Sequence, residues 1–158
     1  MATQHDVRRI ALSLPAAAQV PGRFAFAVPN KGKLKAFVWV WMERVTPKKP
    51  RVPNHGVIAV RVRNLDERAR LLSASATKFF TEPHYDGFPA VLVRLDAVSV
   101  RDLKPLITEA WRCRAPKEIS DAGESRPRSR PAALAPRLRQ ENPTARPRRT
   151  PRPRRRGD

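Results

Sequence analysis

The sequence predicts an α+β domain, in which an antiparallel sheet carries helices on one face, followed by a disordered basic tail. Two kinds of pattern support this fold class. Stretches with strand character, such as residues 34–42 and 57–63, are bounded by turn-forming residues. Apolar residues recur at helical spacing near residues 3–14 and 103–111. The expected order of helix, strand, strand, strand, helix, strand, helix indicates helices packed on one side of a sheet.

The first helix is expected near the N-terminus and leads into a hairpin. Thr3 and Asp6 have the spacing of a helix cap, and Pro15 ends the helical pattern. Residues 23–28 then alternate with period two, and a Gly-containing turn of four residues, 30–33, leads into a long strand. Because side chains alternate along a strand, two sets are expected on opposite faces: Leu34, Ala36, Val38, Val40 and Met42, and Lys35, Phe37, Trp39 and Trp41. Both sets are largely apolar, which is typical of a central strand covered on both faces, or of one that also serves as a binding surface.

The remainder of the domain is expected to hold a loop, two strands and two helices. Residues 46–53 contain three prolines and three basic residues, which predicts an exposed basic loop rather than a central strand. A strand at 57–63 would place Arg61 and Arg63 on its polar face. Asn64 and Glu67 have capping-box spacing before a second helix, and residues 90–95 form a further strand. For the last helix, Asp102 is favoured over Ser99 as the cap, because Pro105 is tolerated in a first turn.

Positive charge is spread over both parts of the chain. Residues 1–115 contain 20 Lys and Arg against 9 Asp and Glu, a net charge of +11, and residues 116–158 contain 13 against 5, a net charge of +8. The second part has eight prolines and no aromatic residue, so it is expected to be disordered, and the domain boundary is predicted after residue 115. A basic domain attracts polyanions, and nucleic acid is the expected partner. A compositional bias toward Arg, Ala, Pro and Gly would explain the tail equally well.

Several features in a fixed order resemble the MmcQ/YjbR family of small bacterial proteins. They are the hairpin with residues 26–28 and Lys31-Gly32-Lys33, the short helix at Asn64, the turn Pro83-His84-Tyr85 with its following strand, and the Ala-Trp helix within 106–115. The resemblance covers roughly residues 3–116. It implies a compact α+β domain with an antiparallel sheet and a proposed double-wing mode of DNA binding. The insert at 46–53 and the tail depart from the family pattern.

Other protein classes are not supported by the sequence. The N-terminus has an early acid, Asp6, and no continuous apolar run before Pro15, unlike a secretory signal, and no stretch approaches the ~18 apolar residues of a membrane span. Cys113 is the only cysteine, which excludes an intramolecular disulfide and favours a cytoplasmic location. The histidines are too scattered to form a metal site, and no phosphate-binding loop pattern is present. No metal, no cofactor and no enzymatic activity are therefore predicted.

The candidate interface is a basic surface formed by the sheet and the hairpin. Strand alternation predicts that Lys35, Arg61, Arg63 and Arg94 share one face near Trp39 and Trp41, where cations would contact phosphates and indoles would stack on bases. The alternative is that the last helix covers both tryptophans. No recognition helix is evident, so binding to DNA, or to RNA, is expected to have little sequence preference. With the turn and tail cations added, the candidate residues are Lys31, Lys33, Lys35, Arg61, Arg63, Arg94, Arg148, Arg149, Arg154 and Arg155.

Two other functions remain open. His84-Tyr85-Asp86 brings together an imidazole, a phenol and a carboxylate, which would suit a small-molecule-binding or catalytic cleft. Adjacent residues seldom converge on one substrate, however, and Pro83 and Gly87 mark a turn, so a structural turn with Tyr85 packed on the sheet is favoured. The third possibility is a protein-interaction module.

Overall fold

The computed structural model describes residues 1–124, which form a six-stranded antiparallel sheet and four α-helices. The strands lie in the order β1-β2-β3-β4-β6-β5. In chain order the elements are α1 (Gln4–Leu12), β1 (Ala18–Gln19), β2 (Ala25–Asn30), β3 (Lys33–Glu43), β4 (Val52–Arg61), α2 (Leu65–Ala74), β5 (Phe79–Phe80), the 3-10 turn η1 (Pro83–Tyr85), β6 (Ala90–Arg94), α3 (Val100–Arg112) and α4 (Lys117–Glu124). The predicted α+β fold class with an antiparallel sheet is confirmed. The two-residue strands β1 and β5 and the helix α4 were not predicted.

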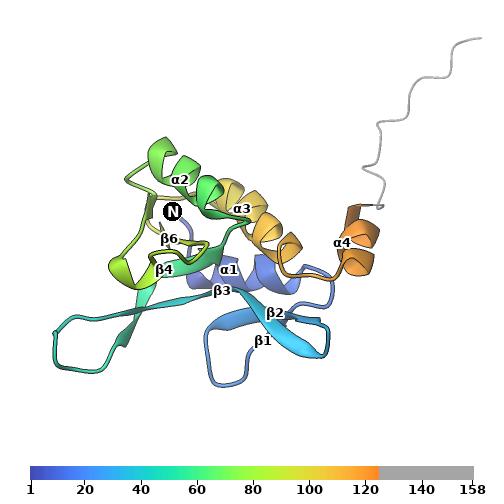
Figure 1. Cartoon of the computed structure of the whole chain (residues 1–158), viewed down its shortest axis with the longest axis horizontal. Coiled ribbons are helices and arrows are strands. Elements are labelled where there is room, and N and C mark those ends of the chain that lie inside the picture. Colours follow the sequence, from blue (N-terminus) through green and yellow to red (C-terminus); the bar gives the residue numbers. More distant parts are fainter. Residues whose placement is uncertain (125–158) are drawn as a thin grey trace, which may run out of the picture. The chain divides into compact units, whose positions relative to one another are not determined.

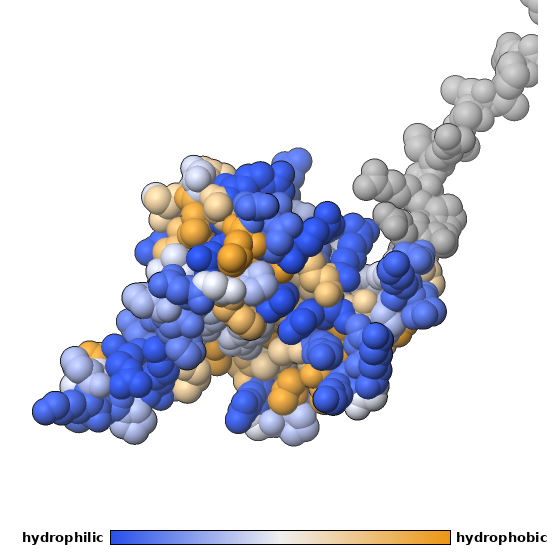
Figure 2. Space-filling view, viewed as in Figure 1, coloured by the Kyte–Doolittle hydropathy of each residue, from blue (hydrophilic) through white to orange (hydrophobic). Residues whose placement is uncertain are grey.

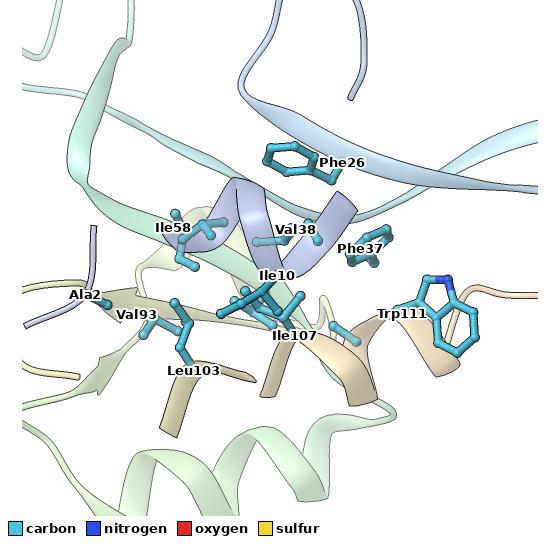
Figure 3. Close-up of a cluster of buried hydrophobic side chains, with 14 of the residues drawn as sticks. Ala2, Ile10, Phe26, Phe37, Val38, Ile58, Val93, Leu103, Ile107 and Trp111 are labelled. Atoms are coloured by element: carbon cyan, nitrogen blue, oxygen red, sulfur yellow. The ribbon is translucent and has the colours of Figure 1, made fainter. Parts of the chain in front are cut away.

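One face of the sheet, here called the helix face, carries the main hydrophobic core (Figure 1). Ile10 of α1 and Leu103 and Ile107 of α3 are almost fully buried against strand side chains such as Phe26 and Val38. Figure 3 shows these residues meeting in one cluster. Side chains of α2 and α4 pack against the same cluster, so all four helices of the described region cover this face.

Helix caps explain where the main helices begin. The Thr3 side chain accepts a hydrogen bond from the Asp6 N–H and Asp6 bonds back, so the predicted cap of α1 is confirmed as a full capping box. The predicted cap of α3 is wrong: Ser99, not Asp102, is the N-cap, and its hydroxyl accepts from the Asp102 N–H at 3.1 Å. Because α3 begins earlier than expected, Pro105 lies inside it. The proline ring is exposed there, so water can bond the carbonyl that lacks its usual donor.

The turn between β2 and β3 is tighter than the sequence suggested. Asn30 pairs with Lys33, which leaves only Lys31 and Gly32 as loop residues. Both have positive φ, at 52° for Lys31 and 72° for Gly32, as a type I′ turn requires. The backbone twist of this turn matches that of the strands, so the hairpin tip is held in a defined geometry.

A β-bulge in β3 changes which residues share a face. Phe26 pairs with Val38 and Ala27 pairs with Ala36, so Phe37 is the extra residue. Phe37 and Val38 are both fully buried in the helix-face core. The predicted alternation through 34–42 is therefore wrong at this point. Lys35 pairs with Val28, a core residue of the helix face, while Trp39 and Trp41 lie on the opposite, second face.

The predicted basic loop at 46–53 is shorter than expected, because β4 begins at Val52 and includes Pro53. Pro53 pairs with Met42 in a two-stranded extension that projects past the neighbouring strands (Figure 1). The pairing of β4 with β6 starts only at Val57, so the missing N–H of Pro53 breaks no ladder hydrogen bond with β6. At the other end β4 stops at Arg61, and Arg63 lies outside the strand.

The boundary expected after residue 115 is also corrected. Residues 117–124 form α4, and Ala115 and Ile119 pack against the helix-face core. The start of the segment expected to be disordered is therefore part of the folded unit, because one Ile and one Ala supply enough apolar contact to hold a short helix in place. Arg148, Arg149, Arg154 and Arg155 lie outside the described residues.

Candidate nucleic-acid interface

The aromatic residues of the second face form a covered cluster rather than a stacking platform. Trp41 and Tyr85 are 8% exposed and share this cluster with Trp39 and Phe80. The Trp39 indole donates a hydrogen bond to the Tyr85 hydroxyl at 3.2 Å, and the Trp41 and Phe80 rings meet edge to face at 5.5 Å. The sequence did not predict that the turn carrying Tyr85 covers Trp39 and Trp41. The alternative prediction, that the last helix covers both tryptophans, is wrong, because α3 packs on the helix face.

The four cations expected on a common face lie in different places. Arg61 and Arg94 lie on the second face, with their guanidinium carbons 4.7 Å and 4.1 Å from the ring centres of Phe88 and Phe80. Arg94 also donates hydrogen bonds to the backbone carbonyls of residues 76 and 77, so its side chain stabilises that loop. Lys35 belongs to the helix face, because of the bulge, and Arg63 contacts Glu109 beside α3. The predicted common face therefore does not exist.

The structure instead gathers cations at the end of the sheet where α3 terminates. A shallow cleft of about 260 Å³ is lined by Asn30, Lys31, Lys35, Cys113 and Arg114. A second cleft of about 200 Å³ also reaches Cys113, and Arg61 and Arg63 line it together with residues of α2 and α3. We call these cations, which surround the one cysteine, the Cys113 cluster: Lys31, Lys35, Arg61, Arg63 and Arg114.

Arg114 is the member of the cluster that sequence reasoning missed. Its backbone carbonyl accepts a hydrogen bond from the Asn30 side chain at 2.7 Å, and its own Nε donates to the Ala36 carbonyl at 3.3 Å. The residue after a helix C-cap is thereby fastened to the β2–β3 hairpin. Basic residues are favoured near helix C-termini, and this was the available sequence signal, but it does not indicate the long-range contact with Asn30.

Burial and the neighbouring charges of the cluster shift the pKa values of Arg61 and Cys113. Partial burial, together with the nearby Arg114 charge, lowers the pKa of the Arg61 guanidinium from its usual value. Burial raises the pKa of the Cys113 thiol, although Arg63, Arg61 and Arg114 act in the opposite direction. Cys113 is thus a neutral thiol at pH 7 and not an activated nucleophile.

Most of these cations have no acidic partner. Within residues 1–124 no ion pair involves Lys31, Lys33, Lys35, Arg61 or Arg114. Arg63 pairs with Glu109 at 3.8 Å, but its side chain is 76% exposed, so this pair contributes little to stability. Lys31 and Lys33 are exposed at the hairpin tip. This end of the domain therefore presents unneutralised positive charge.

A second basic tip lies at the other end of β3. Arg44, Lys48 and Lys49 are exposed on the β3–β4 hairpin, whose projecting end is covered by hydrophilic side chains (Figure 2). The Arg51 side chain does not extend into solvent like these three, because it donates hydrogen bonds to the Met42 carbonyl and to the Glu82 carboxylate, both at 2.8 Å. With eleven residues in β3, the two tips are separated by about 35 Å of strand.

The His84–Tyr85 region is the 3-10 turn η1, whose Tyr85 packs in the second-face cluster. Tyr85 is buried, its hydroxyl accepts from Trp39, and burial raises its pKa, so its role is structural. His84 is exposed, and neither residue lines the three clefts described in this section. No group of His, Cys, Asp and Glu within residues 1–124 is arranged to hold a metal ion.

The largest of these clefts is an apolar groove of about 790 Å³ beside β2 and β3. Its walls include the small side chains of Ala25, Ala27 and Ala36, together with Trp39 and Leu34. Leu34 is 58% exposed. The groove lies where the second face is not covered by the turn that carries Tyr85, since no residue of that turn lines it and no residue of β2 belongs to the cluster around Tyr85.

Taken together, the fold and its charged end define a small α+β domain with a cationic surface beside a hairpin. Comparison with known proteins finds relatives that match most of the chain. Three uncharacterized mycobacterial proteins, Rv2570 and MT2646 of Mycobacterium tuberculosis and Mb2600 of Mycobacterium bovis, are each 35% identical to this chain over 130 residues, which covers 77% of this chain and 95% of the relative. The chain belongs to the same family as these proteins.

A solved structure shares the fold at low sequence identity. It is the crystal structure of Deinococcus radiodurans protein DR2400, a DUF419 domain, with a TM-score of 0.51 and 19% identity over 70% of this chain and 77% of that one. No family model matches the chain. Within residues 1–124, no helix is both long enough and apolar enough to cross a membrane.

Proposed function

We propose that this protein binds DNA with little sequence preference, through the tip of the β2–β3 hairpin and the Cys113 cluster. The observation that carries the proposal is the set of five cations at this end that lack any acidic partner within the described chain. Unpaired Lys and Arg can neutralise phosphates and release counterions without first breaking an ion pair. We also propose MmcQ/YjbR-like membership, which rests on the motif order of the sequence and is compatible with the shared fold.

The rigidity of the hairpin supports the choice of this end. A type I′ turn fixes Lys31 and Lys33, and Arg114 fastens the hairpin to the end of α3. Binding at a turn whose backbone is already fixed loses less backbone entropy than binding at a mobile loop. Base readout is not proposed, since the second-face tryptophans are covered by the turn at Tyr85.

The test uses two double variants that remove the same charge from opposite ends of β3. Lys31→Ala with Lys33→Ala should weaken binding to unrelated duplexes alike and lower the slope of log K against log salt by about 1.8, or about 0.9 for each phosphate that is no longer neutralised. Lys48→Ala with Lys49→Ala is the control and should change the slope much less. Binding is measured by fluorescence anisotropy across a salt series from about 50 to about 300 mM, the range in which phosphate neutralisation changes affinity steeply.

The tail makes a further experiment necessary, because its arginines would bind any polyanion. The same series is therefore run on residues 1–124 as well as on the full chain. Retained, salt-sensitive binding by residues 1–124 supports the proposal. If the shortened protein binds no duplex even at low salt, or if both double variants behave alike, the β2–β3 end is not a DNA-binding surface.

A second candidate function, binding of a small apolar molecule, is favoured by the groove beside β2 and β3. Its volume of about 790 Å³ lies within the range of about 300–1,000 Å³ typical of ligand pockets. Ala36→Leu would add bulk to its wall and should abolish the binding of a neutral apolar dye such as Nile red, while leaving DNA affinity unchanged. A dye that binds both proteins equally would exclude the groove.

A further inference from the structure

The two clefts that meet at Cys113 combine features of an anion site. Each is small, at about 260 Å³ and 200 Å³. Cations make up most of the lining of the first, and the second combines Arg61, Arg63 and Arg70 with Glu67 and Glu109. Cys113 is the one residue common to their linings, so a group bound in either cleft would lie against its thiol.

Two arginines at this junction, Arg61 and Arg114, are held in position by neutral partners. The Arg114 Nε donates a hydrogen bond to the Ala36 carbonyl. The terminal nitrogens of Arg114 have no hydrogen-bond partner in the described chain. The guanidinium carbon of Arg61 lies over the ring of Phe88 at 4.7 Å, and no hydrogen bond to its N–H groups is formed within the described chain. Both therefore keep donors in place for a further acceptor, which is how arginine recognises phosphate.

Holding like charges together has a cost that a purely structural role would not explain. The Arg61 guanidinium is partly buried and close enough to Arg114 for its pKa to be lowered. A helix C-terminus can compensate nearby cations, but two of the last four carbonyls of α3 are already bonded, since Glu109 and Trp111 accept backbone N–H groups of residues 113–115. A bound anion would offset the repulsion directly.

We propose that Arg61, Arg114 and Lys35 form a binding site for a single phosphate group at Cys113. The group can come from a nucleic-acid backbone or from free phosphate or a phosphate monoester, since all present the same oxygen acceptors. In the first case the inference rests on the proposed DNA-binding function and identifies where one backbone phosphate is held. In the second case it stands without that function.

The only cysteine in the chain provides a local test on the full-length protein. The rate of Cys113 alkylation by neutral iodoacetamide is measured in chloride buffer and, at equal ionic strength, with inorganic phosphate or a short duplex. A filled site should slow labelling several-fold, because the anion covers the thiol and disfavours its thiolate.

Matched variants distinguish a specific phosphate-binding site from a general effect of positive charge on labelling. Arg61→Gln and Arg114→Gln should each remove the protection. Arg101→Gln, which removes the same charge from the first turn of α3, about 20 Å along the helix, should retain it. Circular dichroism checks folding, and Lys35→Gln takes the place of any variant that does not fold.

The outcomes distinguish this site from the proposed function. Protection by phosphate and by duplex that disappears in the cluster variants supports a backbone-phosphate site, and protection by phosphate alone supports a site for free phosphate or a monoester. If duplex binds by anisotropy but neither anion slows labelling, the site is refuted while DNA binding stands. Equal loss of protection in Arg101→Gln would also refute it.

Discussion

A single substitution at Lys31 is expected to raise the stability of the fold and to lower the affinity for DNA. It occupies the first central position of the type I′ turn with φ at 52°, a left-handed conformation that disfavours residues with long side chains. Asn is well tolerated there, and Asn-Gly is the preferred pair for this turn. Replacing Lys31 by Asn should therefore stabilise the fold by about 1 kcal/mol, from the usual cost of roughly 1–2 kcal/mol for a left-handed residue. For a domain of this size the midpoint of thermal unfolding should rise by about 2–5 °C.

The same change should weaken DNA binding, since it removes one exposed and unpaired cation from the proposed interface. The salt slope should fall by about 0.9, with lower affinity for every duplex tested. Keeping a lysine where Asn would be more stable is the pattern expected when a strained residue serves a function. Thermal unfolding by circular dichroism and fluorescence anisotropy on the same preparation measure the two effects.

Lys33→Asn is the matched control for Lys31→Asn. Lys33 is the first residue of β3, so its replacement removes the same charge without relieving any left-handed strain. It should lower DNA affinity without raising the unfolding midpoint. If Lys31→Asn leaves the midpoint unchanged or lowers it, the turn assignment is wrong. If it stabilises the protein and leaves affinity intact, the strain at Lys31 has no connection with DNA binding.

Three further predictions concern the fold. Truncation after residue 124 should leave thermal stability nearly unchanged, whereas truncation after residue 115 removes the packing of Ile119 on the core and should cost roughly 1–2 kcal/mol. Tyr85→Phe deprives the Trp39 indole of its acceptor and should cost about 1 kcal/mol in urea unfolding; no loss would mean that water replaces the hydroxyl. A hydrogen bond from Lys78 lowers the pKa of Asp102, so this carboxylate stabilises the fold above its unfolded pKa of about 3.9, and the contribution is lost as pH falls through the lower folded value. Asp102→Asn should therefore reduce the acid sensitivity of the fold, measured by unfolding at a series of pH values from about 5 down to about 2.

The sequence predicted those parts of the fold that depend on local chemistry. Caps at Thr3 and Asn64 were visible as residue spacings, and both side chains accept the expected N–H groups. The strands were visible as apolar runs with turn residues between them. The short strands β1 and β5 were not visible, because two residues carry no periodicity and their pairing is set by tertiary contacts.

The candidate site was harder to predict, because its geometry depends on long-range contacts. Arg61 and Arg114 are fifty-three positions apart, and only the packing of α3 on the sheet brings their charges together. The cover over Trp39 and Trp41 likewise comes from a turn that follows β5. Strand alternation alone could not show that these indoles are enclosed, since an apolar face predicts burial but not which segment provides it.

The bulge at Phe37 connects the core of this domain with its charged end. Without the extra residue, strict alternation would place Lys35 on the second face, with Trp39 and Trp41. With it, Phe37 and Val38 both enter the helix-face core, and Lys35 lies beside Arg114 in the cleft at Cys113. The sequence could not reveal this shift. Both faces of the sheet are covered by apolar side chains, so Phe37 and Val38 could each be buried on either face. The irregularity that fills the core is thus the same one that brings a third cation to the proposed phosphate site.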